Sequence, residues 1–100
     1  MKLITKAIAA KLPPLYGQDG KGMEAIAHLK LFTPWSNWTW YVTEMDPATG
    51  ECFGLVQGLE EELGYFHLPE LENLTGPFGL KVERDLHFDP TPLSRLTNRP

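Results

Sequence analysis

Cysteine is almost absent from this sequence: Cys52 is the only one among 100 residues. A single thiol cannot form an internal bridge, so nothing indicates a secreted scaffold held by disulfides. A lone cysteine on a strand is typical of a small core residue, and we prefer this interpretation to a catalytic nucleophile. No stretch approaches the ~20 apolar residues that span a bilayer, and Lys6 and Lys11 interrupt the faint signal-like pattern at the start. We therefore expect a cytoplasmic protein that does not bind membranes.

Lysine and arginine are missing from the whole middle of the chain. None occurs from Leu31 to Leu80, although the net charge of the full chain is only −4. The same stretch contains Glu44, Asp46, Glu51, Glu60, Glu61, Glu62, Glu70 and Glu72. Such a segment repels a phosphate backbone unless cations intervene, so we expect no nucleic-acid binding without a metal. An acidic surface of this kind also keeps a small protein in solution.

Common catalytic signatures are also lacking. The three histidines show no HExxH spacing, and no GxSxG motif is present. The glycine-rich loop from Gly17 to Gly22 does not match a Walker pattern and does not clearly open a helix. These absences argue against a zinc protease, a serine hydrolase and a nucleotide-binding loop.

Length and composition favour one domain over residues 1–100. With 42% hydrophobic residues, a chain of 100 residues can bury roughly 65% of its unfolded surface. Thr5 can cap a helix, and Ile4, Ile8 and Leu12 form an apolar stripe, so we expect an N-terminal helix within 1–12.

Segments rich in aromatic and β-branched residues predict a small antiparallel sheet within 24–88. The expected strands are 25–33, 38–45, 52–57, 64–68 and 80–88, with a hairpin turn over 46–51. A second short helix is expected over 69–75, because Pro69 suits a first helical turn. Pro90 and Pro92 begin an extended, loosely held tail over 90–100. The predicted fold class is α+β, a small antiparallel sheet of about four to five strands with an N-terminal helix and a second short helix.

An ordered set of motifs resembles one bacterial family. The motifs are Lys30-Leu31-Phe32-Thr33-Pro34, then Trp38-Thr39-Trp40-Tyr41 with Thr43-Glu44 and Asp46, then Phe53-Gly54-Leu55-Val56, Glu62-Leu63-Gly64-Tyr65-Phe66 and Glu83-Arg84-Asp85-Leu86-His87-Phe88. Over about residues 1–95 the chain resembles the family catalogued as domain of unknown function 2958. The resemblance implies a prokaryotic protein, often encoded on plasmids, phages or integrative elements. Some members carry a label as single-stranded DNA endonucleases, but no catalytic motif supports that label, so no catalytic residue is carried over.

The expected last strand holds the candidate metal ligands. Period-2 alternation places Asp85, His87 and Asp89 on one face with Glu83. Carboxylates and an imidazole suit Mg²⁺, Mn²⁺ or Zn²⁺. Neighbours at i and i+2 on a strand lie ~7 Å apart, so one strand alone holds a metal poorly, and a solvated polar face is the preferred interpretation.

Arg84 falls on the opposite, apolar face of that strand. A buried guanidinium without a partner is costly, so Arg84 is expected to pair with a carboxylate. Glu44 is the expected partner, because alternation puts it on the same face as Trp40 and Val42. The alternative is that Arg84 binds an anionic ligand.

Tryptophans and acids supply the remaining candidates. Trp38 and Trp40 point the same way and are expected in the core, whereas Trp35 lies in a turn and is expected to be the most exposed. The run Glu60-Glu61-Glu62 could dock a basic partner or imitate phosphates, although such runs are often solvated loops. The binding candidates are Trp35, Glu44, Asp46, Glu60, Glu61, Glu62 and Arg84.

Three functions stay open on these residues. The preferred hypothesis is a non-enzymatic accessory protein of a mobile genetic element, which binds a protein partner through an acidic, aromatic-bearing surface and needs no cofactor. The alternative is a single-stranded DNA endonuclease that uses Mg²⁺ or Mn²⁺ held by Glu44, Asp46, Asp85, Asp89 and His87. The third is an acidic nucleic-acid mimic that inhibits a host defence protein.

Overall fold

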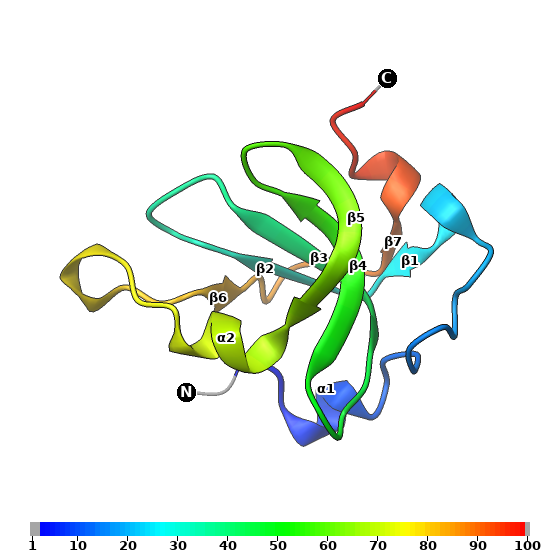
Figure 1. The fold of residues 1–100 in the computed structure, drawn as a ribbon, viewed down its shortest axis with the longest axis horizontal. Helices are drawn as coiled ribbons and strands as arrows, with labels where there is room; N and C mark the ends of the chain where they lie inside the picture. Colours follow the sequence, from blue (N-terminus) through cyan, green and yellow to red (C-terminus); the bar gives the residue numbers. More distant parts are fainter. Residues whose placement is uncertain (1–2, 100) are drawn as a thin grey trace.

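A computed structural model describes residues 3–99, and its main feature is a five-stranded antiparallel sheet in the order β5-β4-β3-β2-β6 (Figure 1). The strands are β2 (Leu29–Phe32), β3 (Thr39–Met45), β4 (Glu51–Gln57), β5 (Glu61–His67) and β6 (Glu83–Arg84). A second pairing joins β1 (Ile26–Ala27) to β7 (Thr91–Pro92). The helices are α1 (Lys6–Ala9) and α2 (Leu68–Asn73), with 3₁₀ turns at Gly22–Glu24, Pro77–Gly79 and Leu93–Arg95. The predicted α+β fold class is confirmed.

The hairpin β3–β4 forms as the sequence predicts. Asp46 accepts a hydrogen bond from the Ala48 N–H at 2.9 Å, which stabilises the start of the turn. Gly50 has a φ of 81°, a left-handed conformation that favours glycine at the end of the turn. The hairpin therefore brings two strongly apolar strands together at the centre of the sheet.

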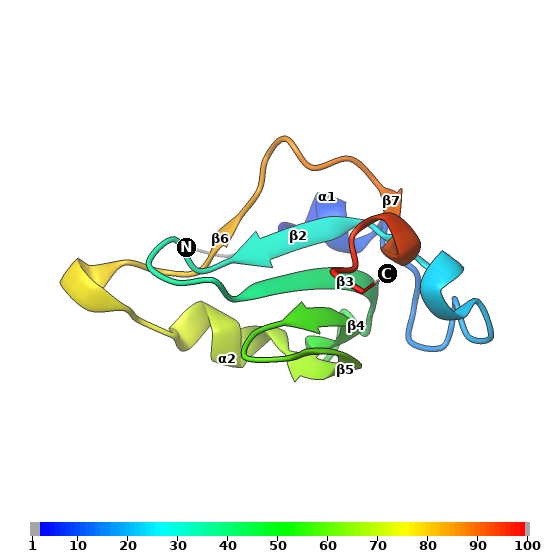
Figure 2. The ribbon, with the colours of Figure 1, turned by 90° about the horizontal axis from the view of Figure 1, so that it is seen from above.

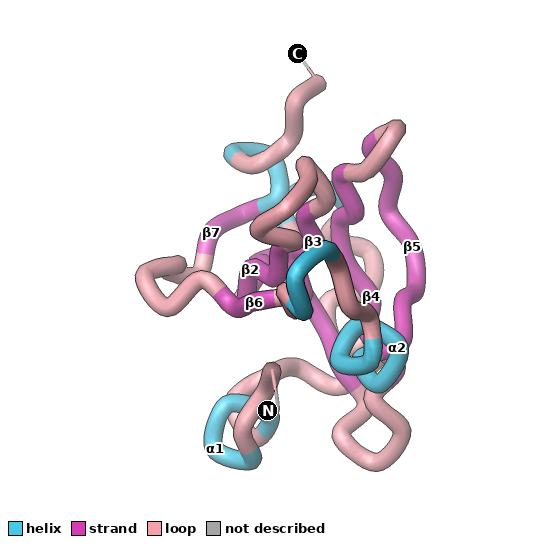
Figure 3. The backbone as a smooth tube through the Cα atoms, turned by 90° about the vertical axis from the view of Figure 1, so that its left-hand side faces the viewer, coloured by secondary structure: helices cyan, strands magenta, loops and turns pink. Residues whose placement is uncertain are grey.

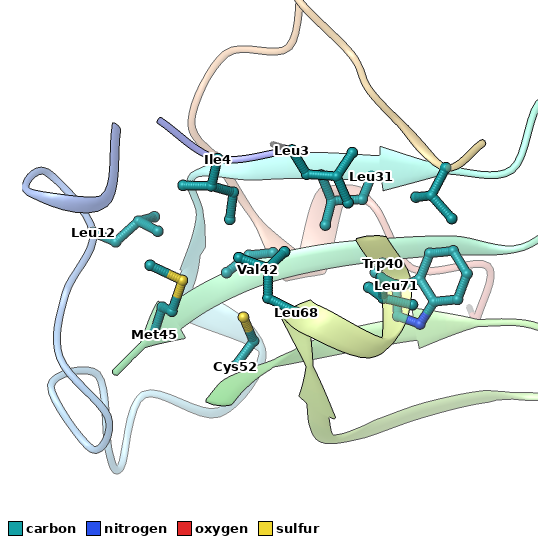
Figure 4. Close-up of a cluster of buried hydrophobic side chains, with 11 residues drawn as sticks. Leu3, Ile4, Leu12, Leu31, Trp40, Val42, Met45, Cys52, Leu68 and Leu71 are labelled. Atoms are coloured by element: carbon teal, nitrogen blue, oxygen red, sulfur yellow. The ribbon is translucent and has the colours of Figure 1, made fainter. Parts of the chain in front are cut away.

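Apolar side chains cover both faces of the sheet. On one face, Leu68 and Leu71 of α2 approach Val42 and Trp40, while Met45 and Cys52 meet at the other end (Figure 4). The opposite face carries a smaller cluster of Ala25, Ala27, Tyr41, Leu55 and Leu93. The sheet is therefore a central layer with a core on each side. Figure 2 shows β2, β3, β4 and β5 of this layer from above.

The expected strand 25–33 divides into two. His28 separates β1 from β2, and its N–H donates to the Val42 carbonyl at 2.8 Å. β2 continues along β3, whereas β1 leaves to pair with β7. The sequence pattern is continuous across the break, so the division depends on a partner that lies far away in the chain.

The prediction of a long last strand over 80–88 is wrong, because only β6 pairs with β2. Asp85 accepts a hydrogen bond from the His87 N–H at 2.9 Å, which turns the chain directly after the strand. Leu86 is consequently 75% exposed instead of packing on the apolar face.

The prediction of a loose tail over 90–100 is also wrong for residues 91–99; Pro100 lies outside the described residues. β7 pairs with β1, and Leu93 is buried in the second core cluster. Burial of Leu93 contributes roughly 1.5–3 kcal/mol, which adds to the strand pairing and to the hydrogen bonds that Glu61 accepts from Thr97 and Asn98.

The helices and β5 differ from the expected bounds. Thr5 caps α1 as predicted, accepting from the Ile8 N–H, but the helix ends at Ala9 and tightens into i→i+3 bonds before Pro13. Residues 1–2 of the expected helix lie outside the described residues. α2 covers 68–73 instead of 69–75, and β5 begins at 61 instead of 64. None of the helices described over 3–99 has the length and apolar character needed to span a bilayer.

Two glycines that face each other across β4 and β5 give a matched test of the packing. A Cβ at Gly54 would overlap the Tyr41 carbonyl oxygen on β3, whereas a Cβ at Gly64 meets open space. We expect Gly54→Ala to lower the free energy of unfolding by about 1–3 kcal/mol or more, because the backbones would have to separate. Gly64→Ala should change it by less than ~0.5 kcal/mol. Urea denaturation measures the free energy of unfolding of both variants. Equal losses of stability in the two variants would contradict this packing.

Candidate functional site

Glu44 lies on the opposite face of the sheet from the one that alternation predicts. The β3–β4 register shifts between Val42 and Glu44, which leaves Thr43 as an extra residue in β3. A one-residue bulge reverses the face of every following side chain. Glu44 therefore pairs with Phe53 and leaves the face of Trp40.

The Glu44 carboxylate is only 6% exposed and fixes the N-terminal loop to the sheet. One oxygen accepts from the Tyr16 N–H at 2.8 Å, and the other accepts from the Gln18 N–H at 2.9 Å. The buried Gln18 side chain extends the network by bonding to both the N–H and C=O of Ile26 and to the Thr43 carbonyl. Glu44 thus has its hydrogen-bonding groups occupied by the protein itself, which makes it a structural residue.

Arg84 has a backbone partner in place of a carboxylate. Its guanidinium donates to the Leu3 carbonyl at 2.8 Å. The predicted Arg84–Glu44 pair is wrong, because the bulge turns Glu44 to the other face and Arg84 lies on β6 at the far edge. Among residues 3–99 the ion pairs are Lys30–Asp85 at 3.9 Å and Arg99–Glu61 at 3.6 Å.

The candidate metal ligands are not brought together. Among the described residues, no group of three or more His, Cys, Asp or Glu side chains is arranged to hold a metal ion. Asp85 is bonded to the His87 N–H and lies near Lys30, while Asp89 follows in the loop before β7. Asp46 lies in the β3–β4 turn, where its carboxylate holds that turn.

The tryptophans differ in exposure from the prediction. Trp40 is buried as expected, but Trp38 is exposed and stacks on it with ring centroids 5.9 Å apart. Trp35 is half-buried against the core and lies over Gly76. Trp38, and not Trp35, is therefore the more accessible ring.

Trp38 borders an open cleft of about 580 Å³ beside β2 and β6. The cleft is also lined by Lys30, Arg84, Asp85 and His87. Its two cations, Lys30 and Arg84, lie in the sequence on either side of the acidic stretch 31–80. These groups are already engaged, since Lys30 pairs with Asp85 and Arg84 bonds to Leu3. The cleft therefore presents no strong field of one sign.

The acidic run Glu60-Glu61-Glu62 divides into two roles. Partial burial alone would raise the pKa of Glu61, but hydrogen bonds from Thr97, the Asn98 N–H and Gln57, together with the Arg99 charge, lower it. Glu61 thereby fastens the C-terminal segment to β5. Glu60 and Glu62 are exposed, so the predicted solvated loop is correct for Glu60 only, because Glu61 and Glu62 belong to β5.

Exposed Tyr16, Leu63 and Tyr65 gather next to these acids. Together with half-buried Phe53 and exposed Asp19 they form a surface that we call the β5 face. Tyr16 is 66% exposed, Tyr65 is 52% exposed and Leu63 is 43% exposed. Phe53 meets Tyr65 edge to face, with centroids 4.9 Å apart. These residues line a hollow of about 370 Å³, and a second hollow of about 360 Å³ continues from Leu63 past Glu62.

Tyr16 reaches the β5 face through a strained backbone. Its φ of 69° is uncommon for a residue with a Cβ, and the bond from its N–H to Glu44 accompanies that conformation. Hydrogen bonding with the Tyr16 side chain is the first cause of a raised pKa of the Tyr65 hydroxyl. Both residues line the same hollow, so the N-terminal loop and β5 present the two rings together.

A family model described as "Protein of unknown function (DUF2958)" matches residues 3–98. The chain belongs to this family. The resemblance seen in the sequence motifs is therefore confirmed over nearly the whole chain of this DUF2958 member. No curated protein and no solved structure matches it.

Sequence reasoning missed Tyr16, Gln18, Leu63 and Tyr65. A strand beginning at residue 61 would have placed Leu63 and Tyr65 on one face by alternation. No local pattern could have found Tyr16 or Gln18, because their position depends on the buried carboxylate of a distant strand.

The hydrogen bonds of Glu44 predict that a nearly isosteric substitution at this residue destabilises the fold. Glu44→Gln replaces one acceptor oxygen with an amide that cannot accept from a backbone N–H, so we expect a loss of about 2–3 kcal/mol in the free energy of unfolding. The exposed Glu62→Gln should change it by less than ~0.5 kcal/mol. Urea denaturation of both variants checks this, and a neutral Glu44→Gln would show that the network does not stabilise the fold.

The Cys52 thiol should be inert in the folded protein. Burial, and then the Glu51 charge, raise its pKa from 9.0 to about 12. Since the folded value exceeds the unfolded one, this group's contribution to stability is complete below pH 9.0 and falls as the pH rises toward 12. We expect iodoacetamide to label it at about pH 8 only after unfolding in urea, because the thiolate is the reactive form. Equal labelling rates in both states would refute the buried position.

Proposed function

We propose that this DUF2958 member is a non-enzymatic accessory protein, of the kind that mobile genetic elements encode, which binds a basic and partly apolar segment of a partner protein on the β5 face. The observation that carries the proposal is the combination of exposed Tyr16, Leu63 and Tyr65 with exposed acids beside them. Aromatic side chains are enriched at the anchors of protein interfaces, because they bury a large area at a small entropic cost.

Charge favours a basic partner. Asp19 is exposed on the β5 face, and Glu60 and Glu62 are exposed at the beginning of β5, where Glu62 points to the opposite side of the strand. None of the three takes part in an ion pair within residues 3–99. Arg99, the cation on the C-terminal segment next to β5, is already paired with Glu61. An acidic rim of this type accelerates association with a basic segment and loses strength as salt is added.

The cleft beside β6 supports the proposal less well. Its cations Lys30 and Arg84 bond to Asp85 and to the Leu3 carbonyl, so an anionic group that binds there would compete with existing contacts. The β5 face has no such requirement, because its exposed side chains need only lose water.

A displayed library of random peptides, panned on the protein at low salt, tests the proposal. We expect enrichment of peptides that combine Lys or Arg with aromatic or branched residues. The double variant Leu63→Ser/Tyr65→Ser should weaken an enriched peptide at least ~10-fold in Kd, whereas the equally polar Phe78→Ser should not. Phe78 is a matched control because it is fully exposed on the segment between α2 and β6, at the far end of the molecule.

Two results would contradict the proposal. One is a library that yields no peptide whose affinity depends on the β5 face. The other is enrichment of acidic peptides, because they would be repelled by Glu60 and Glu62.

A further inference from the structure

β5 is a long edge of the sheet that stays uncovered over most of its length. The strand order places it at one end, and Figure 3 shows it at the outer margin with no strand beyond it. Its seven residues contain no proline, no lysine and no bulge, which are common devices that keep a sheet edge from pairing. The opposite edge, β6, has only two residues before the chain turns away. β5 is therefore the edge on which another strand could fit.

The hydrogen-bond pattern shows which groups of β5 point outward. The Leu68 N–H donates to the Gly50 carbonyl at 2.8 Å, one step beyond the β4–β5 ladder. In an antiparallel ladder, residues that bond to the neighbour alternate with residues that face away from it. The bonded pairs are therefore Cys52–Phe66, Gly54–Gly64 and Val56–Glu62. The N–H and C=O groups of Leu63 and Tyr65 consequently point away from β4.

Two other contacts agree with this assignment. The Val42 carbonyl accepts from His28, so Val42 faces β2 and its β4 partner Gly54 is free to face β5. The Glu61 carbonyl lies on the same outward set as Leu63, and it accepts a hydrogen bond from the Arg99 side chain. The C-terminal segment thus covers the beginning of the edge and leaves it open from residue 62 onward.

We infer that the outer edge of β5 binds its partner by strand addition: an extended basic segment becomes the sixth strand of the sheet, hydrogen-bonded to the main chain of Leu63 and Tyr65. This inference rests on the proposed function and specifies how the partner is held. Added strands obtain affinity from main-chain bonds and specificity from side chains that alternate between the two faces.

The two faces of β5 are complementary to different kinds of side chain in the added strand. On the face of Leu63 and Tyr65, apolar residues would extend the cluster that includes Tyr16. On the other face, Gly64 leaves open space between Glu62 and Phe66. A Lys or Arg stem fits that space and brings its charge to Glu62. A segment that alternates basic and apolar residues therefore matches the edge.

Charge disfavours a second copy of this chain as the occupant. In a two-fold pairing centred on Gly64, the Glu60 end of each copy would approach the Leu68–Glu70 end of the other. Both ends carry exposed acids, and each chain has a net charge of −4. A basic segment removes this repulsion.

Amide hydrogen exchange followed by NMR tests the inference, with an enriched peptide from the display experiment as the probe. In the free protein, the amides of Leu63 and Tyr65 should exchange much faster than those of Gly64 and Phe66. The peptide should slow exchange at Leu63 and Tyr65 at least ~10-fold and change the other two little, because their amides already bond to β4.

Methylation of single peptide nitrogens provides the complementary readout. Strand addition predicts that N-methylation at alternate positions weakens binding at least ~10-fold, while the intervening positions tolerate it, because only every second N–H donates to β5. On the protein, Leu63→Pro removes an outward N–H and should weaken binding similarly, whereas Leu63→Ala keeps it and serves as the control for the lost side chain.

The outcomes separate the two proposals. One outcome is a peptide whose binding depends on Leu63 and Tyr65 but whose N-methylation shows no alternation between sensitive and tolerant positions. This outcome would overturn strand addition and leave the proposed function standing. Absence of any peptide whose binding depends on Leu63 and Tyr65 would overturn both. A third outcome is that exchange at the Leu63 and Tyr65 amides slows as the protein concentration rises, with no peptide present. This would show that a second copy occupies the edge, and would overturn the assignment to a basic segment.

Discussion

One extra residue in β3 determines how the rest of the molecule is connected. The bulge at Thr43 turns Glu44 away from the helix-covered face and buries its carboxylate on the other side of the sheet. A buried carboxylate must be satisfied, and the N–H groups of Tyr16 and Gln18 satisfy it. The loop between α1 and β1 is therefore fixed to the centre of the sheet and not left as a flexible connection.

The contact between Glu44 and the N-terminal loop also positions the surface that we propose as functional. Gln18 holds Ile26 at the start of β1, and β1 in turn pairs with β7 and brings Leu93 into the second core. Tyr16 lines the same hollow as Tyr65. The aromatic part of the β5 face is thus a consequence of a structural carboxylate. Glu44, which the sequence offered as a binding residue, instead positions the residues that we propose to bind the partner.

Charge is distributed differently in space than along the chain. The sequence has no cation between Leu31 and Leu80, yet Lys30 and Arg84 come to lie beside Trp38. Those cations are engaged by Asp85 and by the Leu3 carbonyl, while Glu61 is engaged by Arg99. Glu60, Glu62 and Asp19 are exposed near β5 and form no ion pair among the described residues, so they make up a smaller acidic rim there. An argument from local composition identified the sign of that rim but not its position.

The sequence by itself determined the family, the α+β class, the β3–β4 hairpin, the Thr5 cap and the buried position of Cys52. Each of these follows from neighbouring residues, through alternation, turn chemistry or motifs that are read in order. Only the tertiary structure decided that residues 25–33 form two strands, that 80–88 forms almost none, that the tail is packed, and that Glu44 and Arg84 do not meet. Those outcomes depend on a bulge and on pairings between distant segments. The periodicity of one segment carries no information about which distant strand pairs with it.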